Sequence, residues 1–179
     1  MELEDLARYS PTEQSPLKGT YKDYTILTPQ PPSAGGLHII QLLNIISHWP
    51  VRDWGFNSAR YVQHLSEAFR FIFADKSHFL GDPEFIEIPV KQLLSEDYAR
   101  KIASRIRPGH LQQTYPYGSF DKNQLAKENT THLGVIDSQG NIVSLTQSIN
   151  DFFGSGFVPE GRGFLLNNEM SDFSPYPDS

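Results

Sequence analysis

The feature that most constrains this chain is a change in hydrophobic pattern at Thr130. Before that residue, apolar side chains recur at helical spacing, whereas after it they occur in two short runs separated by a turn. Helices are predicted for residues 37–48, 59–73 and 95–106. Ser95 is a capping residue at the start of the third helix, and Pro50 closes the first. The chain therefore combines a helical part with a β-rich part.

The β-rich part is predicted to begin as an antiparallel strand pair. Residues 133–136 and 142–149 carry β-favouring side chains, and the Ser-Gln-Gly-Asn sequence at 138–141 is typical of the turn between them. A shorter hairpin is predicted at 19–27, with its turn at residues 22 and 23. Residues 111–128 are polar and follow neither period, so they are predicted to form an exposed loop that leads into the strands.

Composition and charge exclude several classes of protein. The chain has 179 residues, of which 38% are hydrophobic and 20% charged, and these values are typical of a globular domain. The formal net charge is −6, and lysines and arginines are scattered, so no nucleic-acid partner is expected. The longest apolar stretch is far shorter than the roughly 18–20 residues of a membrane span, and no span is expected.

The common signatures of metal and cofactor sites are absent from the sequence. It contains no cysteine, and its six histidines show no spacing suited to a shared metal. Neither a Gly-x-Ser-x-Gly nucleophile motif nor a glycine-rich phosphate loop is present. No metal and no cofactor are therefore expected. The first residues carry no secretory signal, although a segment cut from a longer precursor would lack one too.

Thr130 lies where the predicted loop enters the first strand, directly after Asn129. A threonine hydroxyl is a weak nucleophile unless a base takes its proton. If the chain were cut before Thr130, that residue would gain an α-amine with a pKa of about 7.7–8.0, which could serve as the base. The hydroxyl could make the cut itself by attacking the carbonyl of Asn129. A threonine pair at a strand start far more often reflects ordinary β-propensity, so this pattern alone favours the structural explanation over the catalytic one.

Several motifs in order along the chain resemble those of γ-glutamyltranspeptidases. In the β-rich part they are Thr-Thr-His at 130–132, Asp-Ser-Gln-Gly-Asn at 137–141, Asn-Asp-Phe-Phe-Gly-Ser-Gly at 150–156 and Leu-Leu-Asn-Asn-Glu-Met-Ser-Asp-Phe at 165–173. Upstream they are Asp-Leu-Ala-Arg-Tyr at 5–9, Gly-Thr-Tyr at 19–21, Pro-Pro-Ser-Ala-Gly-Gly at 31–36, Glu-Ala-Phe at 67–69, Phe-Ala-Asp at 73–75 and Leu-Gly-Asp-Pro at 80–83. Several motifs in register are more specific than any one of them.

The resemblance implies an α+β chain that forms part of the αββα sandwich of an N-terminal-nucleophile (Ntn) hydrolase. Residues 1–129 resemble the mostly helical end of the large subunit, and residues 130–179 resemble the β-rich start of the small subunit. The fold is therefore expected to be incomplete in 179 residues, with the remainder of both subunits as partners in a heterodimer of processed chains. The family also implies a periplasmic or extracellular location.

The resemblance assigns the chemistry to Thr130. It matches the nucleophile that autocleavage of the Asn129–Thr130 bond exposes and that the γ-glutamyl group then acylates. Ser148 matches a position where relatives commonly have a threonine that hydrogen-bonds the nucleophile. The serine keeps the hydroxyl and loses the methyl group.

Three further positions are expected to bind the substrate. Asn150 matches a residue that contacts its glutamate end, while Glu169 and Asp172 match the pair that holds its α-amino group. A carboxylate pairs naturally with an ammonium group through charge-assisted hydrogen bonds. Without the resemblance, Asn150 would be interpreted as a turn residue, and Glu169 and Asp172 as a solvated acidic turn.

The expected reaction is transfer of a γ-glutamyl group from glutathione or another γ-glutamyl amide to water, an amino acid or a peptide. Two alternatives stay open. One is a related acylase, either cephalosporin acylase-like or poly-γ-glutamate-processing. The other is an inactive fragment or pseudoenzyme, because the oxyanion-hole and carboxylate-binding residues of the family match no position within the 179 residues.

Two other groups are interpreted as structural. The side chain of His132 is expected on the opposite strand face from that of Thr131, and a structural role is favoured over a catalytic one. Phe69, Phe71 and Phe73 are predicted to form part of the core.

Overall fold

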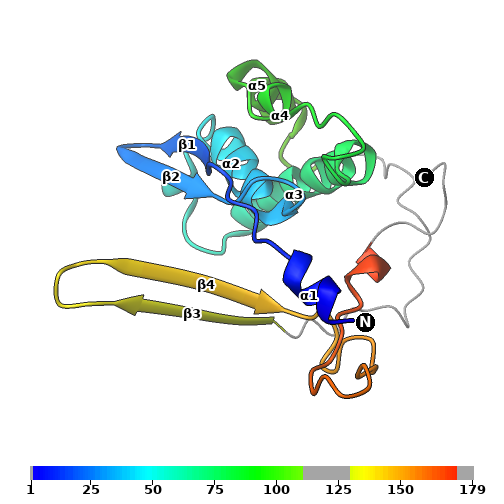
Figure 1. The fold of residues 1–179 in the computed structure, drawn as a ribbon. Helices are drawn as coiled ribbons and strands as arrows, with labels where there is room; N and C mark the ends of the chain where they lie inside the picture. Colours follow the sequence, from blue (N-terminus) through cyan, green and yellow to red (C-terminus); the bar gives the residue numbers. More distant parts are fainter. Residues whose placement is uncertain (1, 111–129, 173–179) are drawn as a thin grey trace. The chain divides into compact units, whose positions relative to one another are not determined.

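The computed structural model describes residues 2–110 and 130–172. The loop predicted at 111–128 lies outside these described residues. In chain order the elements are α1 (Leu3–Arg8), β1 (Leu17–Tyr21), β2 (Tyr24–Thr28), α2 (Ala34–Ile46), the 3₁₀ helix η1 (Val51–Trp54), α3 (Ala59–Phe79), α4 (Val90–Leu93), α5 (Glu96–Arg105), β3 (Thr130–Ile136), β4 (Ile142–Ser148) and the 3₁₀ helix η3 (Glu169–Asp172) (Figure 1). This mixture of helix and strand confirms the predicted α+β class.

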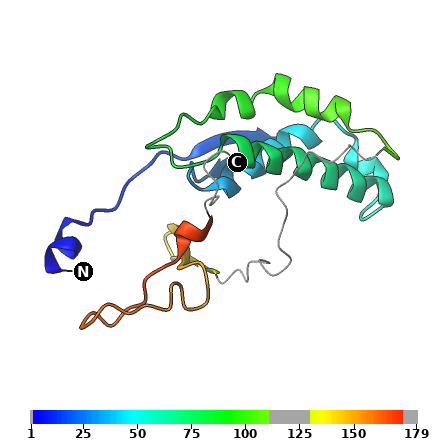
Figure 2. The same ribbon diagram turned by 90° about the vertical axis from the view of Figure 1, so that its right-hand side faces the viewer.

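The described residues fall into two compact units, one of residues 11–110 and one of residues 2–10 and 130–172. In the first, α2 packs against both α3 and α5 (Figure 2). Apolar side chains from these helices, and one just after α5, form the core of this unit: Ile45, Ala68, Phe71, Ile72, Ala99, Ile102, Ala103 and Ile106. These helices therefore bury apolar side chains against one another, as amphipathic helices do.

Two helix ends differ from the predictions by three residues or more. Ser95 caps α5 as expected, its hydroxyl oxygen accepting the Tyr98 N–H at 3.2 Å. However, α3 continues to Phe79 rather than 73, because no proline or glycine interrupts it before Gly81. Likewise α2 begins at Ala34 rather than 37, so it includes Gly36. A Cβ atom at Gly36 would lie 2.2 Å from the Pro29 carbonyl oxygen, so only glycine allows this close approach.

The prediction that three phenylalanines of α3 belong to the core is wrong for two of them. Phe71 is buried, with 8% of its surface exposed, whereas Phe69 and Phe73 are 39% and 49% exposed. Residues two apart on a helix lie on opposite faces, while residues four apart share a face. Consequently the rings of Phe69 and Phe73 lie near each other, 6.4 Å apart, on the side away from Phe71.

Both predicted hairpins are present. In the first unit β1 pairs antiparallel with β2 across the predicted turn, where Lys22 takes a left-handed backbone conformation with φ of 52°. In the second unit β3 pairs antiparallel with β4, and Thr130 lies opposite Ser148 (Figure 1). The side chain of Asp137 closes this turn by accepting the backbone N–H groups of Gln139 and Asn141 at 2.8 and 2.9 Å. These bonds fix the turn, and the turn fixes the register of the strands.

A buried polar cluster joins the three main helices of the first unit. The carboxylate of Asp75 in α3 accepts hydrogen bonds from Gln41 Nε2 of α2 at 2.9 Å and from the Tyr98 hydroxyl of α5 at 2.6 Å. Burial raises the pKa of Asp75 above its usual value, and the two hydrogen bonds only partly oppose that rise. The cluster therefore aligns the helices but makes the charged carboxylate unfavourable.

We predict that Asp75 makes the stability of this unit depend on pH. Because its folded-state pKa is raised, its contribution is fully present below the usual value and is lost as pH rises through the folded-state value. Asp75→Asn, which cannot ionise, should therefore gain stability relative to the parent protein between pH 4 and 7. Asp75→Ala should lose about 1–3 kcal/mol at every pH, since it leaves Gln41 and Tyr98 without their acceptor.

The measurement is the free energy of unfolding by denaturant at several pH values. Asp97→Asn, at an exposed carboxylate of α5 that pairs with Arg100, is the control. A stability difference between Asp75→Asn and the parent that does not change from pH 4 to 7 would contradict the prediction.

Candidate active site

Thr130 and Ser148 lie opposite each other at the open end of the β3–β4 hairpin. The Thr130 hydroxyl donates a hydrogen bond to the Ser148 oxygen, with 3.3 Å between the two oxygens. The same Ser148 oxygen accepts the backbone N–H of Asn150 at 3.0 Å. The hydroxyl of Thr130 is thus tied to the backbone that follows β4. Asn129, the other residue of the predicted cleavage site, lies outside the described residues.

A row of polar side chains continues from Thr130 along one face of the hairpin. Side chains alternate between faces in a strand, so His132 shares the face of Thr130, as predicted from its position beside Thr131. The His132 Nδ1 atom lies 2.8 Å from the Thr146 hydroxyl, and its Nε2 atom lies 3.2 Å from the Ser144 hydroxyl. Both ring nitrogens therefore contact β4, and these contacts brace the two strands against each other.

Asn150 takes a strained conformation immediately after β4. Its φ of 71° lies in the left-handed region, which asparagine tolerates better than most residues. Its side-chain Nδ2 lies 3.0 Å from the Ser171 hydroxyl and 3.3 Å from Asp172 Oδ1. Strained backbone persists only where its surroundings determine it, and such residues concentrate at functional sites. Asn150 links the end of β4 to η3.

Glu169 and Asp172 are the first and last residues of η3. In a 3₁₀ helix, side chains three residues apart lie on the same side, so the two carboxylates project in a common direction. The backbone N–H of Glu169 is held by the Asn167 side-chain oxygen at 3.1 Å. The structure therefore connects Thr130, Ser148, Asn150 and Asp172 in one line of hydrogen bonds, and Glu169 lies in the same turn as Asp172.

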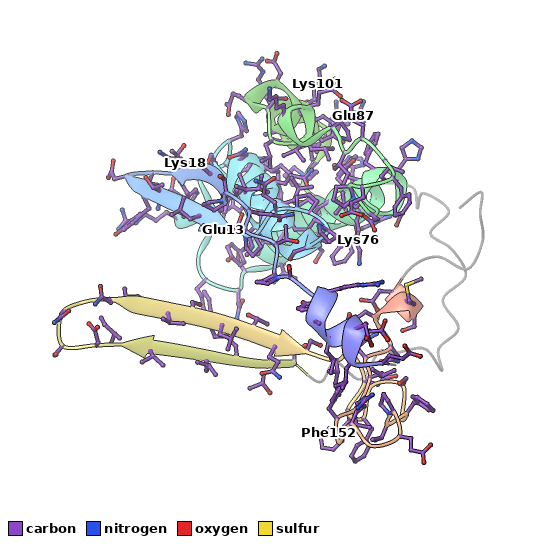
Figure 3. The ribbon with its side chains drawn as sticks, in the orientation of Figure 1. Glu13, Lys18, Lys76, Glu87, Lys101 and Phe152 are labelled. Atoms are coloured by element: carbon purple, nitrogen blue, oxygen red, sulfur yellow. The ribbon has the colours of Figure 1, made fainter. Side chains whose placement is uncertain are left out.

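The segment after Asn150 folds back tightly on the segment before η3. The Leu166 carbonyl oxygen accepts the Ser155 N–H at 2.9 Å, and the Leu166 N–H donates to the Phe157 carbonyl at 3.0 Å. Gly154 makes the approach possible, because its φ is 53° and a Cβ atom there would lie 2.2 Å from the Leu166 oxygen. Phe152 projects from this loop into solvent, with 69% of its surface exposed (Figure 3).

The described residues offer little else that is typical of a functional site. Within residues 2–110 and 130–172, no three histidine or acidic side chains gather as a metal site would require. No helix in this part of the chain is long and apolar enough to cross a membrane. An open cavity of about 400 Å³ lies in the first unit and is lined by Lys22, Val51, Arg52, Gly55, Phe56 and Tyr61. None of the predicted site residues lines this cavity.

Asn168 and Asp151 were missed by the sequence analysis. Asn168 accepts the Asn150 side-chain N–H at its carbonyl oxygen and pairs with Asp151 through its own side chain. Their signal in the sequence is weak, because asparagine and aspartate are typical of ordinary turns.

Comparisons with known proteins agree with the motifs. The sequence model of the family described as gamma-glutamyltranspeptidase matches residues 1–178. The glutathione hydrolase proenzyme of Escherichia coli (strain K12) is 42% identical over 97% of the chain. The crystal structure of Helicobacter pylori γ-glutamyltranspeptidase is 35% identical, with a TM-score of 0.59 over 62% of this chain and 32% of its own. The crystal structure of cephalosporin acylase from Bacillus halodurans is 25% identical, with a TM-score of 0.72 over 99% of this chain and 31% of its own.

The chain spans 30% of the length of the Escherichia coli relative. The structure accordingly resembles only part of the fold of these larger proteins.

We predict that Gly154→Ala loosens the loop between β4 and η3. An alanine there is strained by the left-handed backbone, by about 1–2 kcal/mol, and its Cβ also clashes with the Leu166 oxygen. Gly156→Ala is the matched control, because Gly156 has a φ of 69° but nothing within 4 Å of its Cβ position. Amide hydrogen exchange at Ser155 should accelerate more in Gly154→Ala than in Gly156→Ala. Equal exchange rates in the two variants would show that the clash has no effect.

Proposed function

This chain belongs to the γ-glutamyltranspeptidase family, and we propose that the protein containing it transfers a γ-glutamyl group from glutathione or a similar amide to water, an amino acid or a peptide. The observation that carries the proposal is the hydrogen-bonded line from Thr130 through Ser148 and Asn150 to Asp172. It joins a candidate nucleophile to a candidate binding group for the substrate.

The proposed activation begins with cleavage of the Asn129–Thr130 bond. The Thr130 oxygen attacks the Asn129 carbonyl carbon, the C–N bond breaks, and the chain is held by an ester. Water then hydrolyses the ester, which leaves a carboxylate on Asn129 and a free amine and hydroxyl on Thr130. With a pKa of about 7.7–8.0, that amine can take the hydroxyl proton at neutral pH.

The proposed transfer reaction proceeds through a covalent intermediate. The Thr130 oxygen attacks the γ-carbonyl carbon of the substrate, the amine of the leaving group departs with a proton, and a γ-glutamyl ester forms. Water or the amine of an acceptor then attacks the ester and releases the Thr130 hydroxyl. Such a sequence predicts ping-pong kinetics. Ser148 holds the nucleophile in one orientation by accepting its hydroxyl hydrogen bond.

Glu169 and Asp172 are proposed to bind the α-ammonium group of the substrate. Their carboxylates project from the same side of η3, and a charge-assisted hydrogen bond to an ammonium group is roughly twice as strong as a neutral one. The Asn150 side chain, which contacts Asp172, is proposed to contact the glutamate end beside them.

The exposed hairpin supports the proposal that these residues belong to a larger sandwich. Apolar side chains of both strands are open to solvent, among them Val135, Ile142 and Leu145 at 57%, 72% and 46% exposure. A strand pair of this kind needs further strands or helices against its faces and edges. We propose that the rest of an αββα Ntn-hydrolase fold covers them, with residues 1–129 and 130–179 belonging to the large and small subunits.

The likeness to the cephalosporin acylase favours a second candidate, an acylase of different substrate specificity. The two functions differ in the substrate group that faces η3. A γ-glutamyl donor presents an ammonium group there, which suits two carboxylates. A panel of γ-glutamyl amides and acyl amides without an α-ammonium group distinguishes the two.

We predict that Thr130→Ala abolishes both processing and activity. The parent protein should yield two pieces, one beginning Thr-Thr-His-Leu, by intact mass and N-terminal sequencing. The variant should remain one chain, and its hydrolysis of γ-glutamyl-p-nitroanilide should fall by a factor of at least about 10³, because it has no nucleophile. Thr131→Ala, on the other strand face, is the control and should be processed normally. Cleavage of Thr130→Ala at the same bond would refute the assignment.

Substitutions of Ser148 test the hydrogen bond to the nucleophile. Ser148→Ala removes the acceptor and should slow both processing and kcat by about 10-fold, the equivalent of one hydrogen bond of about 1.4 kcal/mol. Ser148→Thr keeps the hydroxyl and should stay within about 2-fold of the parent, since the accepting oxygen is retained. Single-turnover rates measure the effect, and equal rates for the two variants would argue against this role.

A further inference from the structure

Asn168 makes four hydrogen bonds to the three residues that follow β4. Its backbone N–H donates to the Ile149 carbonyl at 3.3 Å, and its own carbonyl accepts the Asn150 side-chain N–H at 3.3 Å. Its side-chain Oδ1 accepts the backbone N–H of Asp151 at 3.0 Å, and its Nδ2 donates to Asp151 Oδ2 at 2.8 Å. One half-buried residue thus holds a segment that lies 17 residues earlier in the chain.

The two hydrogen bonds that the Asn168 side chain makes to Asp151 require an amide at one position and a carboxylate at the other. The amide of Asn168 offers one donor and one acceptor, and Asp151 presents the matching acceptor and donor from its carboxylate and its backbone. The bond to the carboxylate is charge-assisted and therefore stronger than a neutral one. Aspartate at position 168 would keep the acceptor, lose the donor and place two carboxylates together.

Asn168 also supports η3 directly. Its carbonyl oxygen accepts both the backbone N–H and the hydroxyl of Ser171, at 3.0 and 2.9 Å. The same carbonyl accepts the Asn150 side chain, which reaches on to Asp172. Asn168 therefore joins the end of β4 to the acidic turn alongside Asn150.

The strained backbone of Asn150 lies between two fixed neighbours. Its own N–H is held by the Ser148 oxygen, and the next N–H, of Asp151, is held by Asn168 Oδ1. A left-handed conformation at a residue other than glycine persists when hydrogen bonds on both sides determine it. Loss of the bond to Asn168 would free one side of Asn150.

We infer that Asn168, paired with Asp151, is a positioning residue that sets Asn150 and Asp172 in the geometry for binding the substrate. The inference rests on the proposed function. The hydroxyl pairing of Thr130 with Ser148 comes from the β3–β4 register and is independent of Asn168. Disrupting the pairing of the Asn168 and Asp151 side chains therefore weakens substrate binding without stopping the processing at Thr130.

The test is an exchange of the two side chains in the full natural protein that contains this chain. Asn168→Asp should raise KM for γ-glutamyl-p-nitroanilide by about 10-fold, while kcat stays within about 3-fold and processing is complete. The double variant Asn168→Asp/Asp151→Asn should return KM to within about 2-fold of the parent, because the amide and carboxylate exchange places and both bonds re-form. The double variant also restores the net charge of the parent.

Gln147→Glu is the control for added charge. It introduces the same negative charge near the end of β4, at an exposed position on the strand face opposite Thr130. Its KM should stay near that of the parent. Complete processing, read from intact mass, shows in each variant that the residues around Thr130 are folded.

Each outcome decides the inference. If Asn168→Asp leaves KM unchanged, if Gln147→Glu raises KM equally, or if the double variant is not rescued, the positioning role is refuted and the proposed function stands. A block of processing by Asn168→Asp would also refute it, since the effect would then reach Thr130. If the parent protein shows no Thr130-dependent hydrolysis, the proposed function fails and the inference fails with it.

Discussion

The register of β3 against β4 is the constraint on which the candidate site depends. It places Thr130 opposite Ser148 and sets both hydroxyls, with His132 and Thr146, on one face. Because side chains alternate, a slip of one residue would move every one of these groups to the other face. The hydrogen bonds of Asp137 in the turn act against that slip from the far end of the hairpin. A small polar turn thereby determines which hydroxyl lies opposite that of Thr130.

A second level of organisation starts where the strands end. The Ser148 oxygen links the hairpin to Asn150 by accepting its backbone N–H. The side chain of Asn150 in turn links to η3 by donating to Asp172. Each step is a hydrogen bond among exposed or half-exposed groups, which individually contribute only about 0.5–1.5 kcal/mol. The arrangement therefore depends on several such bonds acting together, in a loop whose close approach at Gly154 leaves no room for a side chain.

Much of the fold follows from patterns that a reader of the sequence can recognise. The β3–β4 pairing was predicted from two β-favouring runs and the turn between them, and counting outward from that turn leads to the pairing of Thr130 with Ser148. The burial of Phe69 and Phe73 was predicted wrongly because both lie at helical spacing, but on the side of α3 away from the buried Phe71. The roles of Asn150, Glu169 and Asp172 came from the family motifs, since polar residues in a turn carry no periodic signal. Asn168 and Asp151 escaped notice because their bond joins residues 17 positions apart, which no local pattern records.

The position of Thr130 at the head of β3 has a consequence for how such a precursor matures. Cleavage of the Asn129–Thr130 bond, as proposed, would leave every pair of the β3–β4 ladder in place. The hairpin that carries Thr130 would then be the same before and after the cut, so the proposed maturation would be a local change in covalent structure rather than a refolding of the hairpin. The proposed cleavage would change the charge around the Thr130 hydroxyl instead. A neutral amide would become an amine and a carboxylate, beside a hydroxyl that was already in position.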